Sequence, residues 1–388
     1  MGSSLLRNAR IVTPDGVLEP GWVELDGATI HDVGLGAREG GTDLGGHLLT
    51  PGFVDIHVHG GAGAAFQQGD PAASRRVAQL HLQHGTTTLL AGLGARPIDE
   101  LVTVAQSLVD LVEEGVLGGI FYEGPFLSST RRGAQDPHTL REPNMAEMQR
   151  LLDAGRGMVR MVTIAPELPG ALDLVRAVVD AGAVAAVGHT DASYDQACAA
   201  FDAGASVATH LFNGMRPIHH RDPGPVVAAL SDERVVCELI ADGFHLHDAT
   251  LKLVFDTVGP ARTTLITDAI EAAGVGDGYY HHGDMDIKVV DGMAMLTDGS
   301  SLAGSTLTMD KALRRAVLSA GVTLHDAVTA ATATPARILG LEGHIGVIAP
   351  GARADMVVLD ESLSVRRVLR QGKWISQSQP GSTTEMVS

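Results

Sequence analysis

Apolar runs of β-strand length alternate with helical patterns along most of the chain, and this alternation constrains the fold more than any other feature. The candidate strands end at His57, Gly92, Glu123, Ile164, Gly188, His210, Ala241 and Asp268. Strands that alternate with helices predict a parallel sheet. Because eight such units are what a closed (β/α)8 barrel needs, we expect an α/β protein of the TIM-barrel class.

Helical patterns fill the segments between these strands. Apolar residues recur at helical spacing over residues 72–83, 98–114, 171–181, 194–203 and 248–258. Glycines such as Gly85 and Gly115 stand where these helices should stop. Further helices are predicted over residues 307–320 and 324–339. Residues 285–296 alternate around Asp291-Gly292, which predicts an inserted hairpin.

The two ends of the chain have a different pattern. Short alternating segments at residues 21–25 and 29–33 flank the turn sequence Asp26-Gly27, and similar segments return at residues 354–360 and 366–375. Such segments are typical of antiparallel strands. We therefore expect residues 1–50 and 345–388 to form one small β-sandwich domain beside a barrel over residues 51–344. The polar residues 376–388 are predicted to be a loose tail.

Charge and composition argue against several classes of function. The chain has 28 Lys plus Arg against 46 Asp plus Glu, a formal net charge of -18. Nucleic acid and anionic membranes demand a basic face and are not expected partners, although local Arg and His residues can still hold one phosphate. Cys198 and Cys237 lie far apart in apolar stretches, so no disulfide is expected. The lack of a membrane-length apolar run predicts a cytoplasmic protein.

Residues that can bind metals stand at the predicted carboxyl ends of the strands, where barrel enzymes build their sites. They are His57, His59, Glu123, His189, His210 and Asp268. Side chains two residues apart on an extended segment point the same way, so His57 and His59 can bind one ion together. Imidazole and carboxylate ligands without cysteine favour an open catalytic site over a closed structural zinc site.

Each of these residues has a structural explanation when it is taken alone. A histidine at one strand end is more often hydrogen-bonded structure than a ligand, and Asp268 alone could cap a helix. Glu123 ends an apolar strand, where a buried carboxylate needs a metal or a cation as partner. The set as a whole favours a divalent metal. Zinc, iron, manganese and cobalt all accept these ligands.

Longer stretches around these residues match one family. They are residues 51–61 (PGFVDIHVHGG), 123–127 (EGPFL), 188–190 (GHT), 209–215 (THLFNGM), 242–245 (DGFH), 267–269 (TDA) and 302–307 (LAGSTL). Over nearly its whole length the chain resembles the N-acetylglucosamine-6-phosphate deacetylases of the amidohydrolase superfamily. The resemblance implies metal-dependent hydrolysis of the sugar acetamide to glucosamine 6-phosphate and acetate.

The resemblance also implies the metal ligands. Glu123, His189 and His210 match the ligands of the principal ion. His57 and His59 match a pair that holds a second ion in some members of the family, whereas other members lack the pair. One or two ions per subunit are therefore implied, with zinc expected first.

Further roles follow from the same resemblance. Asp268 matches the general acid/base. The positions that match or adjoin the substrate site are Asn213, the backbone at Gly214, His245, Leu302 and Ala303. The first three match contacts of the substrate phosphate. Arg221 resembles a phosphate-binding arginine that reaches across from the neighbouring subunit, which implies a homodimer.

One position departs from the family pattern. Many members carry a histidine after the Glu-Gly-Pro-Phe stretch, where it polarises the carbonyl and stabilises the oxyanion, but this chain has Gln135. An amide can donate a hydrogen bond to an oxyanion and cannot carry a positive charge. We expect Gln135 to keep the contact in weaker form and His138 to be a loop residue.

Two other functions agree with part of the pattern. Another amidohydrolase, such as a deacetylase of N-acetylgalactosamine 6-phosphate or a hydrolase of cyclic amides, would share the barrel and the ligands. It would differ at the phosphate contacts of Asn213, Arg221 and His245. A non-catalytic interaction protein of the same fold should lack a ligand or the acid/base residue, and the sequence has all of them.

Overall fold

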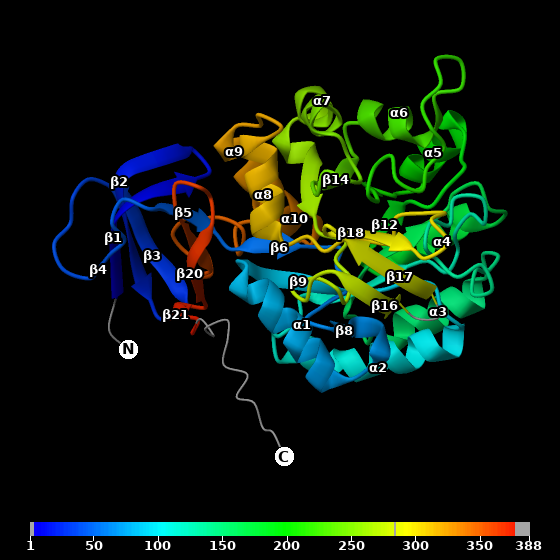
Figure 1. Ribbon diagram of the computed structural model, residues 1–388, viewed down its shortest axis with the longest axis horizontal. Coiled ribbons are helices and arrows are strands. Elements are labelled where there is room, and N and C mark those ends of the chain that lie inside the picture. Colours follow the sequence, from blue (N-terminus) through cyan, green and yellow to red (C-terminus); the bar gives the residue numbers. More distant parts are fainter. Residues whose placement is uncertain (1–3, 283–284, 377–388) are drawn as a thin grey trace.

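The computed structural model describes residues 4–282 and 285–376, and its larger part is built around eight parallel strands (Figure 1). They are β6 (Phe53–Asp55), β9 (Thr86–Leu93), β10 (Gly119–Glu123), β11 (Val159–Ile164), β12 (Val184–Val187), β13 (Val207–Ala208), β14 (Val236–Ile240) and β15 (Thr263–Ile266). Their order in the sheet is their order in the chain, and every neighbouring pair is parallel. The predicted (β/α)8 barrel is confirmed.

Contacts just beyond β6 and β15 bring the first and last strands together. The Asp268 N–H donates to the carbonyl of His57 at 2.8 Å, and the His59 N–H donates to the carbonyl of Ala269 at 2.8 Å. Below them, the Thr267 hydroxyl donates to the buried Asp55 carboxylate at 2.6 Å. These bonds fix the carboxyl ends of the two strands against each other.

Helices cover the outside of the barrel (Figure 1). They are α1 (Pro71–Gln83), α2 (Ile98–Glu113), α3 (Met145–Ala154), α4 (Ala171–Asp180), α5 (Tyr194–Asp202), α6 (Gly224–Ser231), α7 (Asp248–Val258), α8 (Met309–Leu318), α9 (Leu324–Ala331) and α10 (Ala333–Ile338), with short 3-10 turns η1 (Phe66–Gln68) and η2 (Pro260–Arg262). The helices predicted at residues 72–83, 98–114, 171–181, 194–203 and 248–258 are present. Among the described residues, no helix is long and apolar enough to cross a membrane.

Two helical predictions need correction. The single helix predicted over residues 324–339 is wrong, because Thr332 (φ -138, ψ -76) leaves helical geometry and separates α9 from α10. Helix α3 was not predicted, although its start has a local signal. Asn144 caps it by accepting hydrogen bonds from the backbone N–H groups of Ala146 and Glu147 at 3.0 and 3.1 Å.

Segments from both ends of the chain form a second, eight-stranded sheet, which lies to the left in Figure 1. Its strands are β1 (Ser4–Thr13), β2 (Gly16–Asp26), β3 (Thr29–Leu35), β4 (Thr42–Asp43), β5 (Leu48–Pro51), β19 (Met356–Leu359), β20 (Val365–Arg370) and β21 (Lys373–Trp374). Strand β5 pairs with β1 on one side and with β19 on the other, so both ends share one sheet. Except for Ser376, the predicted loose tail lies outside the described residues.

A small three-stranded antiparallel sheet stands beside the mouth of the barrel. It consists of β16 (Gly278–His282), β17 (Met285–Val290) and β18 (Met293–Leu296), and the turn at Asp291-Gly292 joins the last two as predicted. Its apolar face packs Ile287 and Val289 against Ile270 and Ala303. The insertion thereby supports one wall of the site. A shorter hairpin, β7 (Gly60–Gly61) with β8 (Ala64–Ala65), follows β6.

Candidate active site

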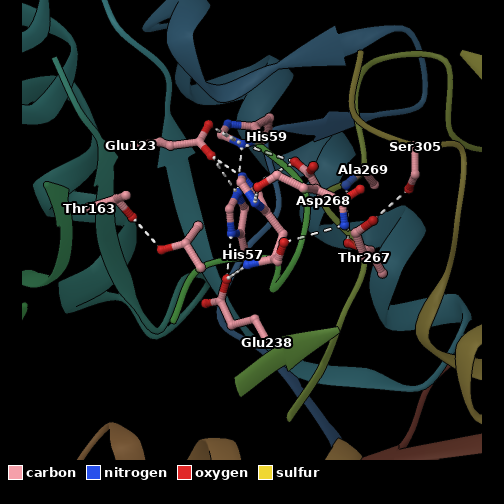
Figure 2. Close-up of polar contacts among 12 residues, drawn as sticks. His57, His59, Glu123, Thr163, Glu238, Thr267, Asp268, Ala269 and Ser305 are labelled. Carbon is pink, nitrogen blue, oxygen red and sulfur yellow. Dashed lines mark hydrogen bonds and ion pairs between the residues drawn. The ribbon is translucent and has the colours of Figure 1, made fainter. Parts of the chain in front are cut away.

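A pocket of about 190 Å³ lies at the carboxyl ends of the barrel strands. Of the residues predicted from sequence, it is lined by His59, Glu123, Gln135, His189, His210, Asn213, Gly214, His245, Asp268, Leu302 and Ala303. His57 is fully buried and contacts this group from below (Figure 2). Besides His57, the predicted residue Arg221 does not line the pocket of its own chain.

Glu123 and two histidines form a donor set for one ion. The Glu123 Oε1 atom lies 3.0 Å from His189 Nε2 and 2.9 Å from His210 Nε2, and the two nitrogens lie 3.1 Å apart. Ligands that bind one ion at about 2.0–2.1 Å lie roughly 3.0–3.4 Å from each other. The three buried side chains therefore fit a divalent metal.

His57 and His59 form a second donor set on the other side of Glu123. Their Nε2 atoms lie 3.1 Å apart, at 3.5 and 3.4 Å from the Glu123 carboxylate. The same two nitrogens lie 3.5 and 3.3 Å from Asp268 Oδ1, as Figure 2 shows. Because both sets face Glu123, that carboxylate is placed to serve two ions as well as one.

The backbone leaves the extended conformation where the strands deliver these side chains. His189, His210 and Asp268 have φ values of 46°, 28° and 48°, in the left-handed region that residues with a Cβ avoid. Such residues cost about 1–3 kcal/mol each and cluster at functional sites. Gly214 (φ 60°) packs on this group, and a Cβ there would come 2.8 Å from His189 Nδ1.

Hydrogen bonds to Nδ1 fix the orientation of the histidine rings. The His189 ring contacts the carbonyl of Arg131 at 2.9 Å, and the His210 ring contacts the carbonyl of Asn213 at 3.1 Å. A carbonyl oxygen can accept a hydrogen bond but cannot donate one. Nδ1 of each ring therefore carries the proton, and Nε2 faces the centre of the site. His57 Nδ1 instead contacts the Glu238 carboxylate at 3.0 Å.

Glu238 was not among the site residues predicted from the sequence. It lies on β14 with a fully buried side chain, inside an apolar run that reads Val-Val-Cys-Glu-Leu-Ile. A carboxylate in an apolar strand was the signal that singled out Glu123. The same signal was present here, two residues before the end of the strand.

The charges in the pocket stabilise one another. Burial lowers the pKa of His59, but the Asp268 and Glu123 carboxylates outweigh burial and raise it to about 9. Burial raises the pKa of Asp268, whereas His57 and His59 lower it to about 2. Burial likewise opposes ionisation of Glu123, yet the surrounding histidines hold its pKa well below the ordinary value. The two histidines therefore favour the ionised form of Asp268, which is the form that accepts a proton.

A histidine–aspartate pair lies at another part of the pocket. His245 Nδ1 contacts Asp242 Oδ2 at 2.7 Å, and Asp242 Oδ1 also accepts the His245 backbone N–H at 2.9 Å. Burial lowers the pKa of His245, but Asp242 more than offsets this and raises it above the ordinary value. Asp242 therefore favours the protonated form of the His245 imidazole. Asn213 immediately precedes Gly214, and its side-chain amide donates a hydrogen bond to the carbonyl of His210 at 3.3 Å.

Gln135 is held at both ends of its amide. Its Oε1 accepts from the Ala95 N–H at 2.8 Å, and its Nε2 donates to Glu123 Oε2 at 2.6 Å. It therefore supports a proposed metal ligand at the edge of the pocket, and a contact to a substrate carbonyl stays a prediction. His138 is exposed and lies outside the pocket lining.

Arg221 lies on an exposed loop before α6. Its Nη1 contacts the ring of the neighbouring His220 at 2.7 Å. The base of the loop is held by Arg216, which donates to Asp222 at 3.0 Å and to Asp191 at 3.2 Å. Arg216 thus anchors the base of the loop, while the cationic side chain of Arg221 lies outside the pocket lining.

Comparison with known proteins agrees with this geometry. The model of the amidohydrolase family matches residues 48–375. The chain is 35% identical to N-acetylgalactosamine-6-phosphate deacetylase of Escherichia coli O157:H7, over 96% of this chain and 99% of that protein. It is 32% identical to N-acetylglucosamine-6-phosphate deacetylase of Bacillus subtilis, over 95% and 96%.

A solved structure is also similar. It is a variant of N-acetyl-D-glucosamine-6-phosphate deacetylase from Mycobacterium smegmatis in complex with N-acetyl-D-glucosamine 6-phosphate. The two chains are 46% identical with a TM-score of 0.93, over 96% of this chain and 99% of that one. The resemblance stated from the sequence is confirmed.

Proposed function

We propose that this chain, which belongs to the amidohydrolase family, is an N-acetylglucosamine-6-phosphate deacetylase that releases acetate and glucosamine 6-phosphate. One observation carries the proposal. A single pocket combines metal-binding donors, the Asp268 carboxyl group and the His245 imidazole. These groups match the metal, the proton transfers and the phosphate that this hydrolysis requires.

Glu123, His189 and His210 would hold the principal ion, and His57 and His59 would hold a second ion, where one binds, with Glu123. When bound, a divalent metal supplies a Lewis acid and a water of lowered pKa. Zinc is the ion we propose first, because histidine and carboxylate ligands with an open position are its usual catalytic set. Iron, manganese and cobalt accept the same ligands.

Asp268 is the general acid/base. Its carboxylate accepts a proton as water attacks the acetyl carbonyl, and it then donates that proton to the sugar nitrogen as the C–N bond breaks. Without the second transfer, the bond would have to expel an unstable amide anion. Gln135 donates to the carbonyl oxygen when its amide turns from Glu123, and Leu302 and Ala303 form an apolar wall of the acetyl site.

The phosphate is held by His245, Asn213 and the backbone at Gly214. Arg221 completes this site from the neighbouring subunit of a homodimer. Two observations support the assignment: the side chain is exposed, and it lies outside the pocket lining of its own chain. A planar guanidinium can bind phosphate through two parallel hydrogen bonds, and this remote contact fixes the acetyl group for attack.

Substrate comparison tests the proposed function. We would measure kcat/KM for N-acetylglucosamine 6-phosphate, N-acetylgalactosamine 6-phosphate and unphosphorylated N-acetylglucosamine. We expect N-acetylglucosamine 6-phosphate to be the best substrate and unphosphorylated N-acetylglucosamine to be the poorest. N-acetylgalactosamine 6-phosphate is included because the Escherichia coli relative is named as a deacetylase of this sugar. A higher kcat/KM with the galacto epimer would show that this sugar is the preferred substrate, while the proposed hydrolysis of an acetamide would still hold.

Two further predictions from the sequence stay predictions. One is a cytoplasmic location, which cell fractionation would test. The other is the division into a barrel over residues 51–344 and a β domain from residues 1–50 and 345–388. Limited proteolysis that cuts near residues 50 and 344 before it cuts within the barrel would support that division.

A further inference from the structure

Glu238 makes contacts that the proposed mechanism does not use. It projects from β14 into the interior of the barrel, beneath the donor cluster, and its side chain has no exposed surface. Figure 2 places His57 between Glu238 on one side and His59, Glu123 and Asp268 on the other. A carboxylate at such a position needs partners, because burying an unpaired charge is costly.

One oxygen of Glu238 holds two of the proposed metal ligands. Its Oε2 atom contacts His57 Nδ1 at 3.0 Å and accepts the backbone N–H of His210 at 3.1 Å. The other oxygen, Oε1, has no hydrogen-bond partner within the described part of the chain. The interactions of the carboxylate are therefore directed at the two histidines.

The contact with His57 differs in kind from those that hold the other rings. His189 and His210 each donate Nδ1–H to a neutral backbone carbonyl, whereas His57 faces a carboxylate. An acceptor with a full negative charge makes the stronger hydrogen bond and raises the electron density at the opposite nitrogen. His57 Nε2, 3.1 Å from His59 Nε2, is therefore more strongly polarised than Nε2 of His189 or His210.

We propose that Glu238 is a positioning residue that sets the metal affinity of the site formed by His57, His59 and Glu123. It fixes the proton of His57 on Nδ1, aims Nε2 at the ion and adds a negative charge behind the ring. The inference rests on the metal site of the proposed function. Glu238 contacts a proposed ligand and is not itself a ligand. Its interaction with His57 determines whether the second ion is retained.

Glu238→Gln isolates the charge. The amide oxygen of glutamine can keep both hydrogen bonds, while its NH2 group replaces the unpartnered Oε1. Apoprotein of wild type and variant would be titrated with Co2+ and with Zn2+ against a competing chelator, and bound metal would be counted by mass spectrometry. We expect a 10- to 100-fold loss of affinity for the ion at His57 and His59, with the ion at Glu123, His189 and His210 retained.

Thr163→Val is the matched control. Thr163 is fully buried in the same barrel interior and pairs with the Thr209 hydroxyl at 2.9 Å (Figure 2). The substitution also removes a buried polar interaction, but it leaves His57 untouched. Its metal affinities should equal those of the wild type. An equal loss in both variants would show a general effect of disturbing the barrel and would overturn the proposal.

The principal ion shows which contact of Glu238 matters. Its ligand His210 donates a backbone N–H to Glu238, so an effect through that contact would weaken binding of the ion at Glu123, His189 and His210. A loss of affinity for that ion as large as the loss at His57 and His59 would contradict the proposal. Unchanged affinity in the Glu238→Gln variant would contradict it as well.

Glu238→Asp guards against a glutamine variant that does not fold. It keeps the charge but withdraws it from His57 by one methylene, so we expect a smaller loss of affinity than with glutamine. Thermal unfolding of both apoproteins would show which variant is folded. No sugar is present in these titrations, so their outcome is independent of whether the proposed substrate is correct.

Discussion

The donor cluster and the Arg221 loop belong to the same proposed site but differ sharply in how they are held. The cluster residues His57, His59, Glu123, His189 and His210 are exposed by no more than 6% and contact one another at about 3 Å. Arg221 is exposed, and its side chain contacts the adjacent His220. One region is assembled within one chain, whereas the other presents its cation outward.

The difference separates two kinds of function. A cluster fixed by buried strands can bind metal and transfer protons without a partner, because its geometry is complete before substrate arrives. An outward-facing arginine gains its role only where an anion comes within reach. Substitutions in the cluster should therefore change turnover, and substitutions in the loop should change substrate binding.

The largest effect is expected from Asp268→Asn. The amide cannot carry a proton between water and the leaving amine, so kcat should fall by roughly 10²–10⁴-fold while KM changes little. Acetate release under saturating substrate would measure kcat. Metal content should stay at the wild-type level, which separates lost proton transfer from a lost ion. A variant with most of its kcat would show that another group is the base.

Arg221→Ala should act on binding alone. Hydrogen bonds from a charged donor contribute about 1.5–3 kcal/mol, so KM for the phosphorylated sugar should rise roughly 10- to 100-fold with kcat nearly unchanged. Arg234→Ala is the matched control, since Arg234 is also exposed and pairs with Asp202 and Asp232 away from the pocket. Equal KM values for the two variants would contradict the phosphate role.

Mixing two defective variants would sharpen the comparison further. Arg221→Ala and Asp268→Asn homodimers are each impaired. If Arg221 serves the neighbouring site, a mixed dimer contains one site with both residues intact, and activity at low substrate should return after subunit exchange. If Arg221 served its own chain, each site of the mixed dimer would keep one defect, and no activity would be regained.

Asp242→Asn should move the pH dependence of binding. Burial lowers the pKa of His245 and Asp242 raises it above the ordinary value, so the imidazole stays charged to a higher pH in the wild type. KM for the phosphorylated sugar should rise as pH increases through that pKa. In the variant the rise should begin at lower pH, with a severalfold higher KM near neutrality. Coincident profiles would show that the charge of His245 does not hold the phosphate.

Gln135→His should have the smallest effect. The family resemblance implies a histidine at this position, so we expect kcat to stay within a few-fold or to increase. The glutamine amide links Ala95 to Glu123 at 2.8 and 2.6 Å. A large fall in kcat would show that this link matters more than the carbonyl contact that we assigned from the resemblance.

Much of the inner site could be predicted because the physics of a parallel barrel is local and periodic. Alternation of side chains placed His57 and His59 together, and a parallel sheet brings its carboxyl ends to one face. The structure brings Glu123 and Asp268 to that face as expected. The terminal strands were found for the same reason, since alternation and turn residues are visible in short windows.

The remaining features were missed or left open for separate reasons. Glu238 lies within its strand, and its partner His57 is far away in the sequence, so a search of strand ends passes over it. The break at Thr332 had a local signal, because Pro335 has no backbone N–H to donate within one continuous helix. The role of Arg221 came from resemblance, since an exposed loop in one chain carries no sign of what it meets.

The central claim is that this pocket removes an acetyl group with a metal ion. The most direct test is acetate release from N-acetylglucosamine 6-phosphate by metal-loaded protein, by chelator-treated protein and by treated protein after a divalent ion is restored. The account predicts activity in the first and third samples and its loss in the second. Full activity in the chelator-treated protein, with its metal content confirmed as zero, would contradict the account.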